Sequence, residues 1–247
     1  MTNKKSINNQ MYIVGLIPAR SGSKGIKNKN IKILKDKPLI YYTIKQSLDC
    51  KFIDETIVST DCENIAKISR EYGAKTPFLR PIEISGDFST DYEFVYHYLE
   101  FLKSNNKRIP DLIVQLRPTC PNRNMKDLND SLKIMIKEFN NYDSLRSVNK
   151  LDKSPFKMYL INDNALKPLF EKYNDMKEPY NQCRQVLPQA YLHNGYIDII
   201  KPSVVFEKKS ITGDIIYPYI MDFSSENIID IDTDKDWEKF ASNDEKN

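Results

Sequence analysis

The chain has 247 residues, of which 40% are hydrophobic and 29% charged, a composition typical of a globular protein built around one large domain. Its formal net charge of +3 argues against nucleic acid as a partner, and no apolar run approaches the roughly 20 residues of a membrane helix. The four cysteines stand far apart, so neither a disulfide framework nor a zinc site is expected. Residues 1–10 are polar and carry no secretory signal, and we expect a cytoplasmic protein.

Apolar, β-rich runs alternate with helical patterns over the first 149 residues. The patterns predict strands at residues 11–17, 55–59, 112–116 and 144–148, and helices at 38–48, 61–72, 90–103 and 124–139. Asp61, Thr90 and Asn124 are expected to cap helices, and Gly73 follows the second helix at a position that favours glycine. This alternation predicts an α/β fold, a mostly parallel sheet with helices on both faces.

The pattern changes over residues 150–190, which are rich in Lys, Asn, Asp, Tyr and Pro and contain no long helical run. This segment is either an insertion that leaves the sheet to meet a second subunit or an ordinary surface excursion. The α/β pattern then returns, with strands expected at 197–200 and 215–221 and helices at 203–206 and 233–240. We therefore expect one α/β domain made of residues 11–149 and 191–240, with 150–190 as an insertion.

A loop rich in small residues and cations follows the first predicted strand. Residues 21–25 read Ser-Gly-Ser-Lys-Gly, and small residues let backbone N–H groups approach an anion. Arg20, Lys24 and Lys29 add positive charge suited to a triphosphate. The loop is not a P-loop, because Lys24 is followed by Gly25. It predicts phosphate binding at the carboxyl edge of the sheet, with a solvated turn as the alternative.

Asp230 and Asp232 stand two residues apart near the end of an apolar run. On a strand, this spacing places both carboxylates on the same face. Such oxygen ligands suit Mg²⁺, which proteins bind through one or two carboxylates together with substrate phosphates. The alternative is that Asp232 or Thr233 caps the last helix. Beside a phosphate-binding loop, the magnesium site is the favoured interpretation.

Three further loops at expected strand ends carry arginines, namely Arg80, Arg117 with Arg123, and Arg184. A single arginine of this kind is usually a surface ion-pair partner. Arginines on three such loops favour an anionic ligand, and we expect Arg117 and Arg123 to point toward it.

These motifs, in this order and spacing, resemble the acylneuraminate cytidylyltransferase family, also called CMP-sialic acid synthetases. The first motif, Ile-Pro-Ala-Arg-Ser-Gly-Ser-Lys-Gly, stands at residues 17–25 and is followed by Lys29 and Asn30. The other motifs stand at residues 58–61, 80–87, 117–123, 184–195 and 229–233. The likeness covers about residues 11–240.

The resemblance implies a Rossmann-like, three-layer nucleotidyltransferase that transfers CMP from CTP to the anomeric hydroxyl of a 2-keto-3-deoxy sugar acid and releases pyrophosphate. The residues that it places at the nucleotide are Ala19, Arg20, Ser21, Ser23, Lys24, Lys29, Asn30, Arg80, Asp87 and Ser89. Those that it places at the anionic sugar are Arg117, Lys157, Arg184, Gln185, Asn194 and Asp198. Asp230 and Asp232 would hold Mg²⁺, and Lys29, Arg20 and Asp232 are the expected catalytic residues.

Negative charge accumulates on the phosphoryl oxygens during such a transfer, so placed cations and Mg²⁺ carry most of the catalysis. Lys29 is expected to lie nearest the α-phosphate, and Asp232 or the metal to help remove the proton of the attacking hydroxyl. The resemblance also implies a homodimer in which the insertion reaches the partner's active site. There Lys157 and Arg184 would face the carboxylate of the sugar.

The chain departs from the family pattern mostly on the acceptor side. Arg117 stands in place of the family's Gln before Pro-Thr, and Asp91 stands in place of its second Ser after the Arg-Pro loop. Leu192 replaces the Arg before Asn-Gly, and Asp198 replaces the aromatic residue after that pair. Arg117 and Asp198 either pair with each other or each recognise a new substituent. We therefore expect an acceptor other than N-acetylneuraminate, such as a legionaminate- or pseudaminate-like sugar or a smaller anionic acid. Asp91 also borders the expected nucleotide side, where it bears on the choice of base.

Two other functions fit parts of the pattern. A nucleotidylyltransferase that acts on a sugar phosphate or another small anionic acceptor is favoured slightly by the basic Arg117. Against it, Lys157 and Arg184 favour a carboxylate. A nucleotide-binding module without turnover would predict the loss of Lys29 or of one of the paired aspartates, and all three residues are present.

Overall fold

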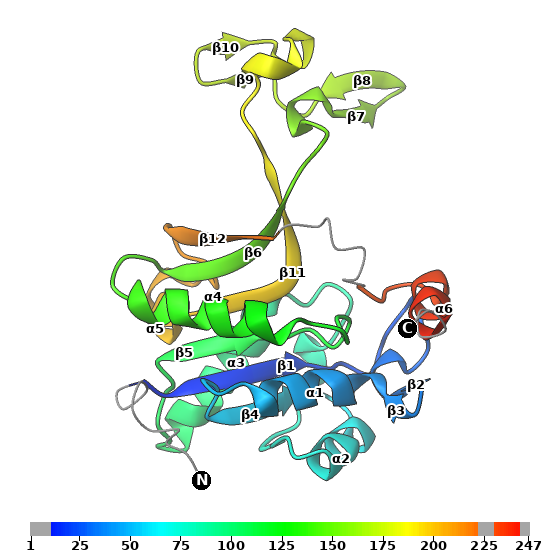
Figure 1. Cartoon of the computed structure of the whole chain (residues 1–247), viewed down its shortest axis with the longest axis vertical. Coiled ribbons are helices and arrows are strands. Elements are labelled where there is room, and N and C mark those ends of the chain that lie inside the picture. Colours follow the sequence, from blue (N-terminus) through cyan, green and yellow to red (C-terminus); the bar gives the residue numbers. More distant parts are fainter. Residues whose placement is uncertain (1–10, 222–229, 243–247) are drawn as a thin grey trace.

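The computed structural model describes residues 11–221 and 230–242 (Figure 1). At its centre lies a six-stranded sheet with the strand order β12-β6-β11-β5-β1-β4. The strands are β1 (Ile13–Pro18), β4 (Glu55–Ser59), β5 (Leu112–Gln115), β6 (Ser144–Lys150), β11 (Tyr191–Ile200) and β12 (Ile216–Met221). β11 runs antiparallel to both of its neighbours, whereas the other neighbouring pairs are parallel. The expected α/β fold with a mostly parallel sheet is confirmed.

Helices cover both faces of the sheet, giving three layers (Figure 1). The helices are α1 (Leu39–Asp49), α2 (Glu63–Glu71), α3 (Asp91–Ser104), α4 (Met125–Lys137) and α5 (Pro202–Lys208). Successive side chains of a strand point to opposite faces, so Ile13 and Ile17 of β1 pack with α1, α2 and α4. Val14 and Leu16 pack on the other face with α3 and α5.

Capping residues fix several helix ends as the sequence predicts. Thr90 forms a capping box with Glu93 at the start of α3, and the Asn124 side chain accepts a hydrogen bond from the backbone N–H of Lys126 at the start of α4. Gly73, just after α2, has a φ of +94°, a conformation that a side chain would strain.

The expected capping role of Asp61 was wrong. α2 begins at Glu63, and its N-cap residue is Cys62. The Asp61 carboxylate instead accepts hydrogen bonds from the backbone N–H and the hydroxyl of Ser21, at 2.8 and 2.5 Å. Because both carboxylate oxygens are used there, Asp61 fastens the loop after β1 to the end of β4.

Between β6 and β11 the chain leaves the sheet and forms a small projecting unit (Figure 1). Its parts are the hairpins β7 (Tyr159–Asn162) with β8 (Ala165–Pro168) and β9 (Lys172–Tyr173) with β10 (Met176–Lys177), and the short turns η3 (Pro155–Lys157), η4 (Pro179–Asn181) and η5 (Arg184–Val186). As expected, the described segment holds no long helix. β11 begins earlier than the expected residue 197, because Tyr191, Leu192 and His193 continue its pairing with β6.

A third apolar cluster lies beside the carboxyl edge of the sheet. α6 (Asp234–Ser242) contributes Trp237, which packs with Ile231 and with Ile26, Leu34 and Leu39. The intervening chain forms η1 (Lys29–Ile31) and the short hairpin of β2 (Ile33–Leu34) and β3 (Lys37–Pro38). The cluster therefore brings the C-terminal part of the chain against the loop that follows β1. None of the helices in the described ranges is long and apolar enough to cross a membrane.

Candidate active site

A pocket of about 450 Å³ opens beyond the carboxyl ends of β1 and β5. Most of the residues expected to bind the nucleotide line it, namely Arg20, Ser23, Lys24, Lys29, Asn30, Arg80 and Ser89. Arg117 and Asp232, from two other motifs, line it as well. The fold thus gathers loops that are far apart in the sequence at the edge where open parallel sheets bind ligands.

Buried hydrogen bonds hold the loop after β1 in place. The Asn30 side chain is 7% exposed and donates a hydrogen bond of 2.9 Å to the carbonyl of Arg20. Ala19 is buried, and its backbone N–H donates to the carbonyl of Ser59. Ala19 and Ser21 lie outside the pocket lining and shape the loop from behind.

Asp87 pairs with two cations of this loop. Its carboxylate lies 2.8 Å from Arg20 and 2.7 Å from Lys24. Hydrogen bonds from Lys24 and from Arg20 hold the pKa of Asp87 below its usual value. Asp87 itself is not part of the pocket lining, so its contact with the pocket passes through the two cations.

Arg80 forms a fixed, flat wall of the pocket. Its guanidinium donates to the hydroxyl and the carbonyl of Ser59 and lies over the ring of Phe94, 5.0 Å from the centroid. Burial lowers the pKa of Arg80 to about 10. Phe94 also lines the pocket, so this end presents planar groups of the kind on which a nucleobase stacks.

Lys29 joins the loop to the segment that carries the paired aspartates. Its ammonium lies 2.8 Å from Oδ1 of Asp232 and 3.0 Å from the carbonyl of Ile231. A Cβ on Gly25 would lie 2.2 Å from the backbone oxygen of Asp232. The glycine in the loop is therefore needed for this close approach.

Asp230 and Asp232 belong to an irregular segment, and not to the strand end that the spacing suggested. The rest of that expected strand lies outside the described residues. The backbone N–H of Ile231 donates to the carbonyl of Thr119, which fixes the segment against the loop after β5. The tertiary packing, and not the strand period, places the two carboxylates.

The two aspartates fit a site for a divalent cation. Desolvation raises the pKa of Asp230. A hydrogen bond from Thr119 lowers this pKa, and the negative charge of Asp232 raises it. Asp230 thus has less compensation of its charge than Asp232, which pairs with Lys29. The described residues contain no cluster of three or more His, Cys, Asp and Glu side chains, so a bound Mg²⁺ would take its other ligands from phosphates and water.

The capping alternative holds for the neighbouring residues. The backbone N–H of Thr233 donates to Asp236, and that of Asp236 donates to the hydroxyl of Thr233, so these two residues cap α6. The Asp232 carboxylate is bonded to Lys29 instead. The residues that cap α6 therefore differ from the two carboxylates expected to hold Mg²⁺.

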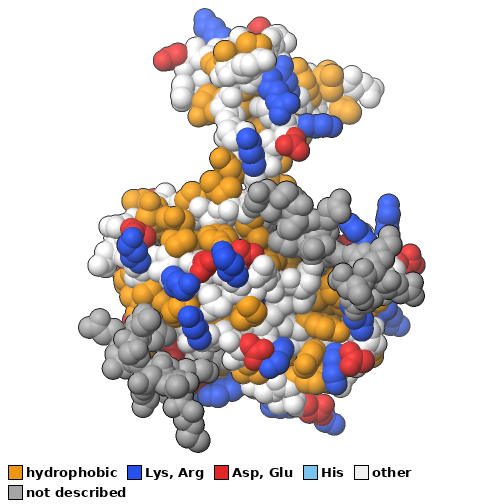
Figure 2. All heavy atoms as spheres, in the orientation of Figure 1, with side chains coloured by type: hydrophobic (Ala, Val, Ile, Leu, Met, Phe, Trp, Pro, Cys, Tyr) orange, Lys and Arg blue, Asp and Glu red, His pale blue; other side chains and the backbone are white. Residues whose placement is uncertain are grey.

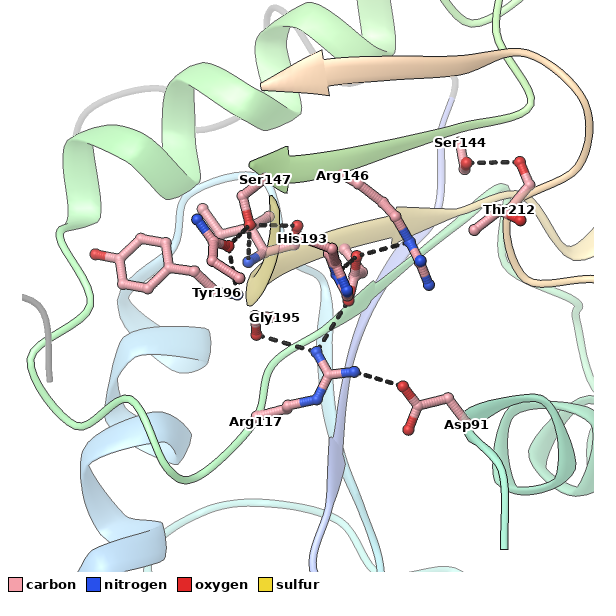
Figure 3. A network of polar contacts seen from close by, with 12 residues as sticks. Asp91, Arg117, Ser144, Arg146, Ser147, His193, Gly195, Tyr196 and Thr212 are labelled. Atoms are coloured by element: carbon pink, nitrogen blue, oxygen red, sulfur yellow. Dashed lines mark hydrogen bonds and ion pairs between the residues drawn. The ribbon is translucent and has the colours of Figure 1, made fainter. Parts of the chain in front are cut away.

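Arg117 is paired on both sides (Figure 3). It donates hydrogen bonds to Asp91 at 2.5 Å, to Asp198 at 3.0 Å and to the carbonyl of Gly195 at 3.0 Å. Gly195 has a φ of +66°, and a Cβ there would lie 2.8 Å from Nη1 of Arg117. Of the two roles that the sequence left open for Arg117 and Asp198, the structure shows pairing.

Asp198 is the buried centre of this network, with a residue exposure of 1%. Besides Arg117, it contacts Arg146 at 3.2 Å and His193 at 2.8 Å. Burial alone raises its pKa, but the hydrogen bond from His193 and the nearby positive charges hold it below the usual value. Asp198 is therefore a charged group at the junction of three strands.

Arg123 does not point toward a ligand, contrary to expectation. It is 3% exposed and donates to the carbonyls of Tyr196 and Arg117 and to the side chain of Gln46. A buried arginine with these partners braces the loop after β5, and Arg123 lies outside the pocket lining.

The remaining acceptor-side residues do not line the pocket of their own chain. Lys157, Arg184 and Gln185 lie on the projecting segment, where Lys157 donates to the carbonyl of Tyr180. Asn194 accepts hydrogen bonds from the Ser147 hydroxyl and the Tyr196 backbone, and donates to Asn149. Within one subunit, Asn194 therefore stabilises the base of the projecting segment.

Sequence reasoning missed two carboxylates of the site. The local pattern at Asp61 predicts a helix cap, although its place after β4 at the carboxyl edge is a signal for the site. The sequence marks Asp91 as a departure from a motif that borders the nucleotide side, but it does not reveal that Asp91 pairs with Arg117 at the pocket lining. Both roles depend on partners that no local pattern reveals.

Comparison with known proteins decides the family. Residues 14–218 match the cytidylyltransferase family. The chain belongs to this family. It is 31% identical over 226 residues to the N-acylneuraminate cytidylyltransferase of Escherichia coli O18:K1:H7, a match that covers 92% of this chain and 50% of that protein. The chain thus spans about half the length of this relative.

Two further relatives of this cytidylyltransferase differ in their sugar. The CMP-N,N'-diacetyllegionaminic acid synthase of Legionella pneumophila is 32% identical, and the match covers 92% of this chain and 94% of that protein. The pseudaminic acid cytidylyltransferase of Campylobacter jejuni is 31% identical over 73% of this chain and 74% of its own length. The chain is a nucleotidyltransferase related to nonulosonic acid synthetases at about 30% identity.

Solved structures agree on the fold of this cytidylyltransferase. The CMP:2-keto-3-deoxy-manno-octonic acid synthetase, complexed with CTP, gives a TM-score of 0.66 at 15% identity and covers 95% of this chain and 98% of its own. The 4-diphosphocytidyl-2C-methyl-D-erythritol synthase of Anaerococcus prevotii gives 0.62 at 14% identity, covering 96% and 99%. At such identities the likeness concerns the fold alone, which is that of a three-layer nucleotidyltransferase.

Proposed function

We propose that this cytidylyltransferase transfers CMP from CTP to the anomeric hydroxyl of a 2-keto-3-deoxy sugar acid of the nonulosonate class, with release of pyrophosphate. The observation that carries the proposal is the contact of Lys29 with Asp232 at the wall of a pocket that also holds Arg20 and Lys24. This contact supports the proposal, because cations suited to a triphosphate lie beside carboxylates suited to a metal. The names of the relatives at about 30% identity support the substrate class.

The cations of the loop after β1 are proposed to bind the triphosphate. Arg20 and Lys24 both form ion pairs with the Asp87 carboxylate. The Lys29 side chain, which is 14% exposed, lies deeper and pairs with Asp232. Lys29 is therefore the cation that we propose for the α-phosphate. Fixed donors aimed at oxygens that gain charge in the transition state act without reorganisation, and removing one typically slows a reaction by about 10²–10³-fold.

Asp230 and Asp232 are proposed to hold Mg²⁺. When bound, Mg²⁺ supplies charge neutralisation and Lewis-acid polarisation at the phosphates. The chain's own contribution is to fix the two carboxylates, through the hydrogen bond of Ile231 to Thr119 and the contact with Lys29. Asp232 lines the pocket and is proposed to assist removal of the proton from the attacking hydroxyl.

The acceptor's carboxylate requires a cation besides Arg20, Lys24 and Lys29, which are proposed for the triphosphate. The guanidinium of Arg117 is occupied by Asp91, Asp198 and a carbonyl. We propose a homodimer in which Lys157 and Arg184, with Gln185 beside them, reach the partner's pocket. Asn194 is proposed to support this side from the base of the segment that carries them.

The surface of the projecting segment supports an association between subunits. Figure 2 shows hydrophobic side chains on this part of the molecule. Exposed apolar residues of the segment include Met158, Tyr159, Leu160, Ile161, Leu166, Leu169 and Phe170. Exposed apolar residues gathered in this way are typical of an interaction surface.

A legionaminate- or pseudaminate-like sugar is the proposed acceptor, in preference to N-acetylneuraminate. The charged residues at positions 91, 117 and 198 replace uncharged ones of the family motif, and two of them line the pocket.

We further propose a cytoplasmic location, which agrees with the absence of disulfides among Cys50, Cys62, Cys120 and Cys183.

The test is a pyrophosphate-release assay with CTP, Mg²⁺ and a panel of keto-acid sugars, followed by the mass of the product. A product with one phosphate is expected, with a nonulosonate other than N-acetylneuraminate as the best substrate. Best activity with N-acetylneuraminate would overturn the acceptor assignment. A diphosphate-linked product would show a sugar-phosphate acceptor, and CTP binding without release of pyrophosphate for any acid would show a non-catalytic module.

A further inference from the structure

Asp91, Arg117 and Asp198 form a continuous chain of ion pairs that leads from the pocket wall into the sheet (Figure 3). The side chains are 33%, 25% and 2% exposed in that order. The outer two residues line the pocket, and the innermost one does not. The outer end of this ion-pair network, Asp91, therefore lies at the pocket, and its inner end, Asp198, is buried in the protein.

The inner end of the network, Asp198, is held by contacts with three side chains. Asp198 lies on β11, directly opposite Gln115 of β5 and Arg146 of β6 in the strand pairing. Its carboxylate contacts Arg117, Arg146 and His193 at 3.2 Å or less. A buried carboxylate with several charged hydrogen-bond partners is held in one orientation, because any other orientation would leave buried charge unpaired.

Arg117 transmits this anchoring to the pocket. One terminal nitrogen donates to Asp198 and to the carbonyl of Gly195, and the other donates to Asp91. Because the guanidinium is planar and rigid, fixing one side fixes the other. With a carboxylate on each side, its positive charge is compensated, so this wall does not offer a free cation to an anionic substituent.

Asp91 is the group that the network presents to a ligand. It lies in the first turn of α3, and one of its oxygens accepts the hydrogen bond from Arg117. Its other oxygen, Oδ1, has no hydrogen-bond partner within the described ranges. An ionised carboxylate can only accept hydrogen bonds, so this oxygen matches an N–H or O–H group and repels a carbonyl or an anion.

We propose that Asp91 is a specificity-determining residue that selects an uncharged N–H or O–H donor of the substrate, and that Asp198 is a positioning residue that acts on it through Arg117. The proposal rests on the cytidylyl transfer proposed above. Two parts of the substrates carry such a donor. One is the exocyclic amino group of cytosine, and the other is a hydroxyl or acylamino N–H of the sugar acid.

The first arm of the test measures binding of CTP and UTP to the wild-type chain, Asp91→Asn and Asp198→Asn. UTP carries a carbonyl where CTP carries the amino group, and an asparagine side chain can pair with either. If the amino group of cytosine is the donor that Asp91 selects, the preference for CTP over UTP falls about tenfold or more in Asp91→Asn. It also falls in Asp198→Asn.

The second arm measures kcat/KM for pairs of sugar acids that differ by one hydroxyl or acylamino group. If the acceptor is the source, the ratio for one such pair falls about tenfold or more in Asp91→Asn, and the CTP/UTP preference is unchanged. In either arm the double variant Asp91→Asn with Asp198→Asn shows no more than the larger single effect, because both residues act through one chain of contacts.

Asp143→Asn is the matched control. Asp143 is also a paired carboxylate, bonded to Lys208 and to the backbone of Asp214 and Ile215, but it lies outside the pocket lining. Its loss is expected to lower the melting temperature and to leave both discrimination ratios unchanged. It therefore separates a general loss of stability from a loss of selectivity.

Unchanged ratios in both arms for Asp91→Asn would overturn the specificity role. A changed ratio in Asp91→Asn with none in Asp198→Asn would overturn the positioning role. If no acid releases pyrophosphate with the wild-type chain, the proposed function fails, and the CTP/UTP arm still decides the inference: a lowered preference supports it, and an unchanged one overturns it.

Discussion

The ammonium of Lys29 lies 2.8 Å from the carboxylate of Asp232, although 203 residues separate them in the chain. The pair joins the loop after β1 to the segment with the paired aspartates, and Trp237 of α6 packs behind it with Ile26 and Leu39. The two motifs therefore act as one unit. Changes on either side are expected to affect both nucleotide binding and catalysis.

We expect Lys29→Met to lower kcat by about 10²-fold or more with a smaller effect on KM for CTP, because the lysine faces charge that grows in the transition state. Steady-state kinetics with saturating Mg²⁺ measures this. Lys126→Met is the control, since Lys126 forms a similar ion pair of 3.0 Å with Asp130 on the surface of α4. Equal losses in both variants would contradict the role of Lys29.

Gly25→Ala is expected to displace the Asp230–Asp232 segment, because the new Cβ would lie 2.2 Å from the backbone oxygen of Asp232. Overpacking of this kind destabilises by about 1–3 kcal/mol, and we also expect kcat to fall at least about tenfold. Gly22→Ala is the matched control, because no atom lies within 4 Å of its Cβ position. Thermal unfolding and kinetics of the two variants should differ clearly, and similar behaviour would argue against the close approach.

Removal of the metal should abolish pyrophosphate release, and Asp232→Asn should raise the Mg²⁺ concentration needed for half-maximal rate by about tenfold or more. The reason is that the described site offers two carboxylates and no third protein ligand of that kind. Titration of activity with Mg²⁺ measures the change. Full activity in a chelator would exclude the proposed metal role.

Subunit mixing can test whether the projecting segment serves the partner's pocket. Lys157→Ala and Lys29→Met should each be nearly inactive alone. In a mixed dimer one pocket combines an intact Lys29 with an intact Lys157, so equal mixing should restore about a quarter of the wild-type rate. No recovery, with mixed dimers shown by mass, would place Lys157 in the pocket of its own chain.

Asp143 predicts a loss of stability in acid. The hydrogen bond from Lys208, with those from the backbone of Asp214 and Ile215, lowers the pKa of Asp143 from 3.8 to about 2. A carboxyl whose pKa is depressed by folding stabilises the protein above its unfolded pKa, and this stabilisation is lost as the pH falls through the folded value. Between about pH 4 and 2, unfolding free energy should therefore fall more steeply in the wild type than in Asp143→Asn. Parallel curves would contradict the assignment.

Much of the fold was readable from local signals. The alternation of apolar residues predicted the strands, and Thr90, Asn124 and Gly73 marked helix ends, because these depend on neighbours in the sequence. Asp61 misled for the same reason: its cap pattern is local, but its carboxylate bonds Ser21, which is 40 residues away. The strand suggested for Asp230 and Asp232 likewise gave way to an irregular segment fixed by Thr119.

Residue type and spacing alone establish the α/β class, the loop of small residues and cations, and the family that these motifs resemble. The partners of the charged groups, in contrast, follow from the three-dimensional fold. Arg117 could equally have faced a ligand, but it lies between Asp91 and Asp198, while Arg123 is buried in hydrogen bonds to the backbone. The energy of a charged side chain depends on its burial and on the charges that surround it, and those are set by contacts between segments far apart in the chain.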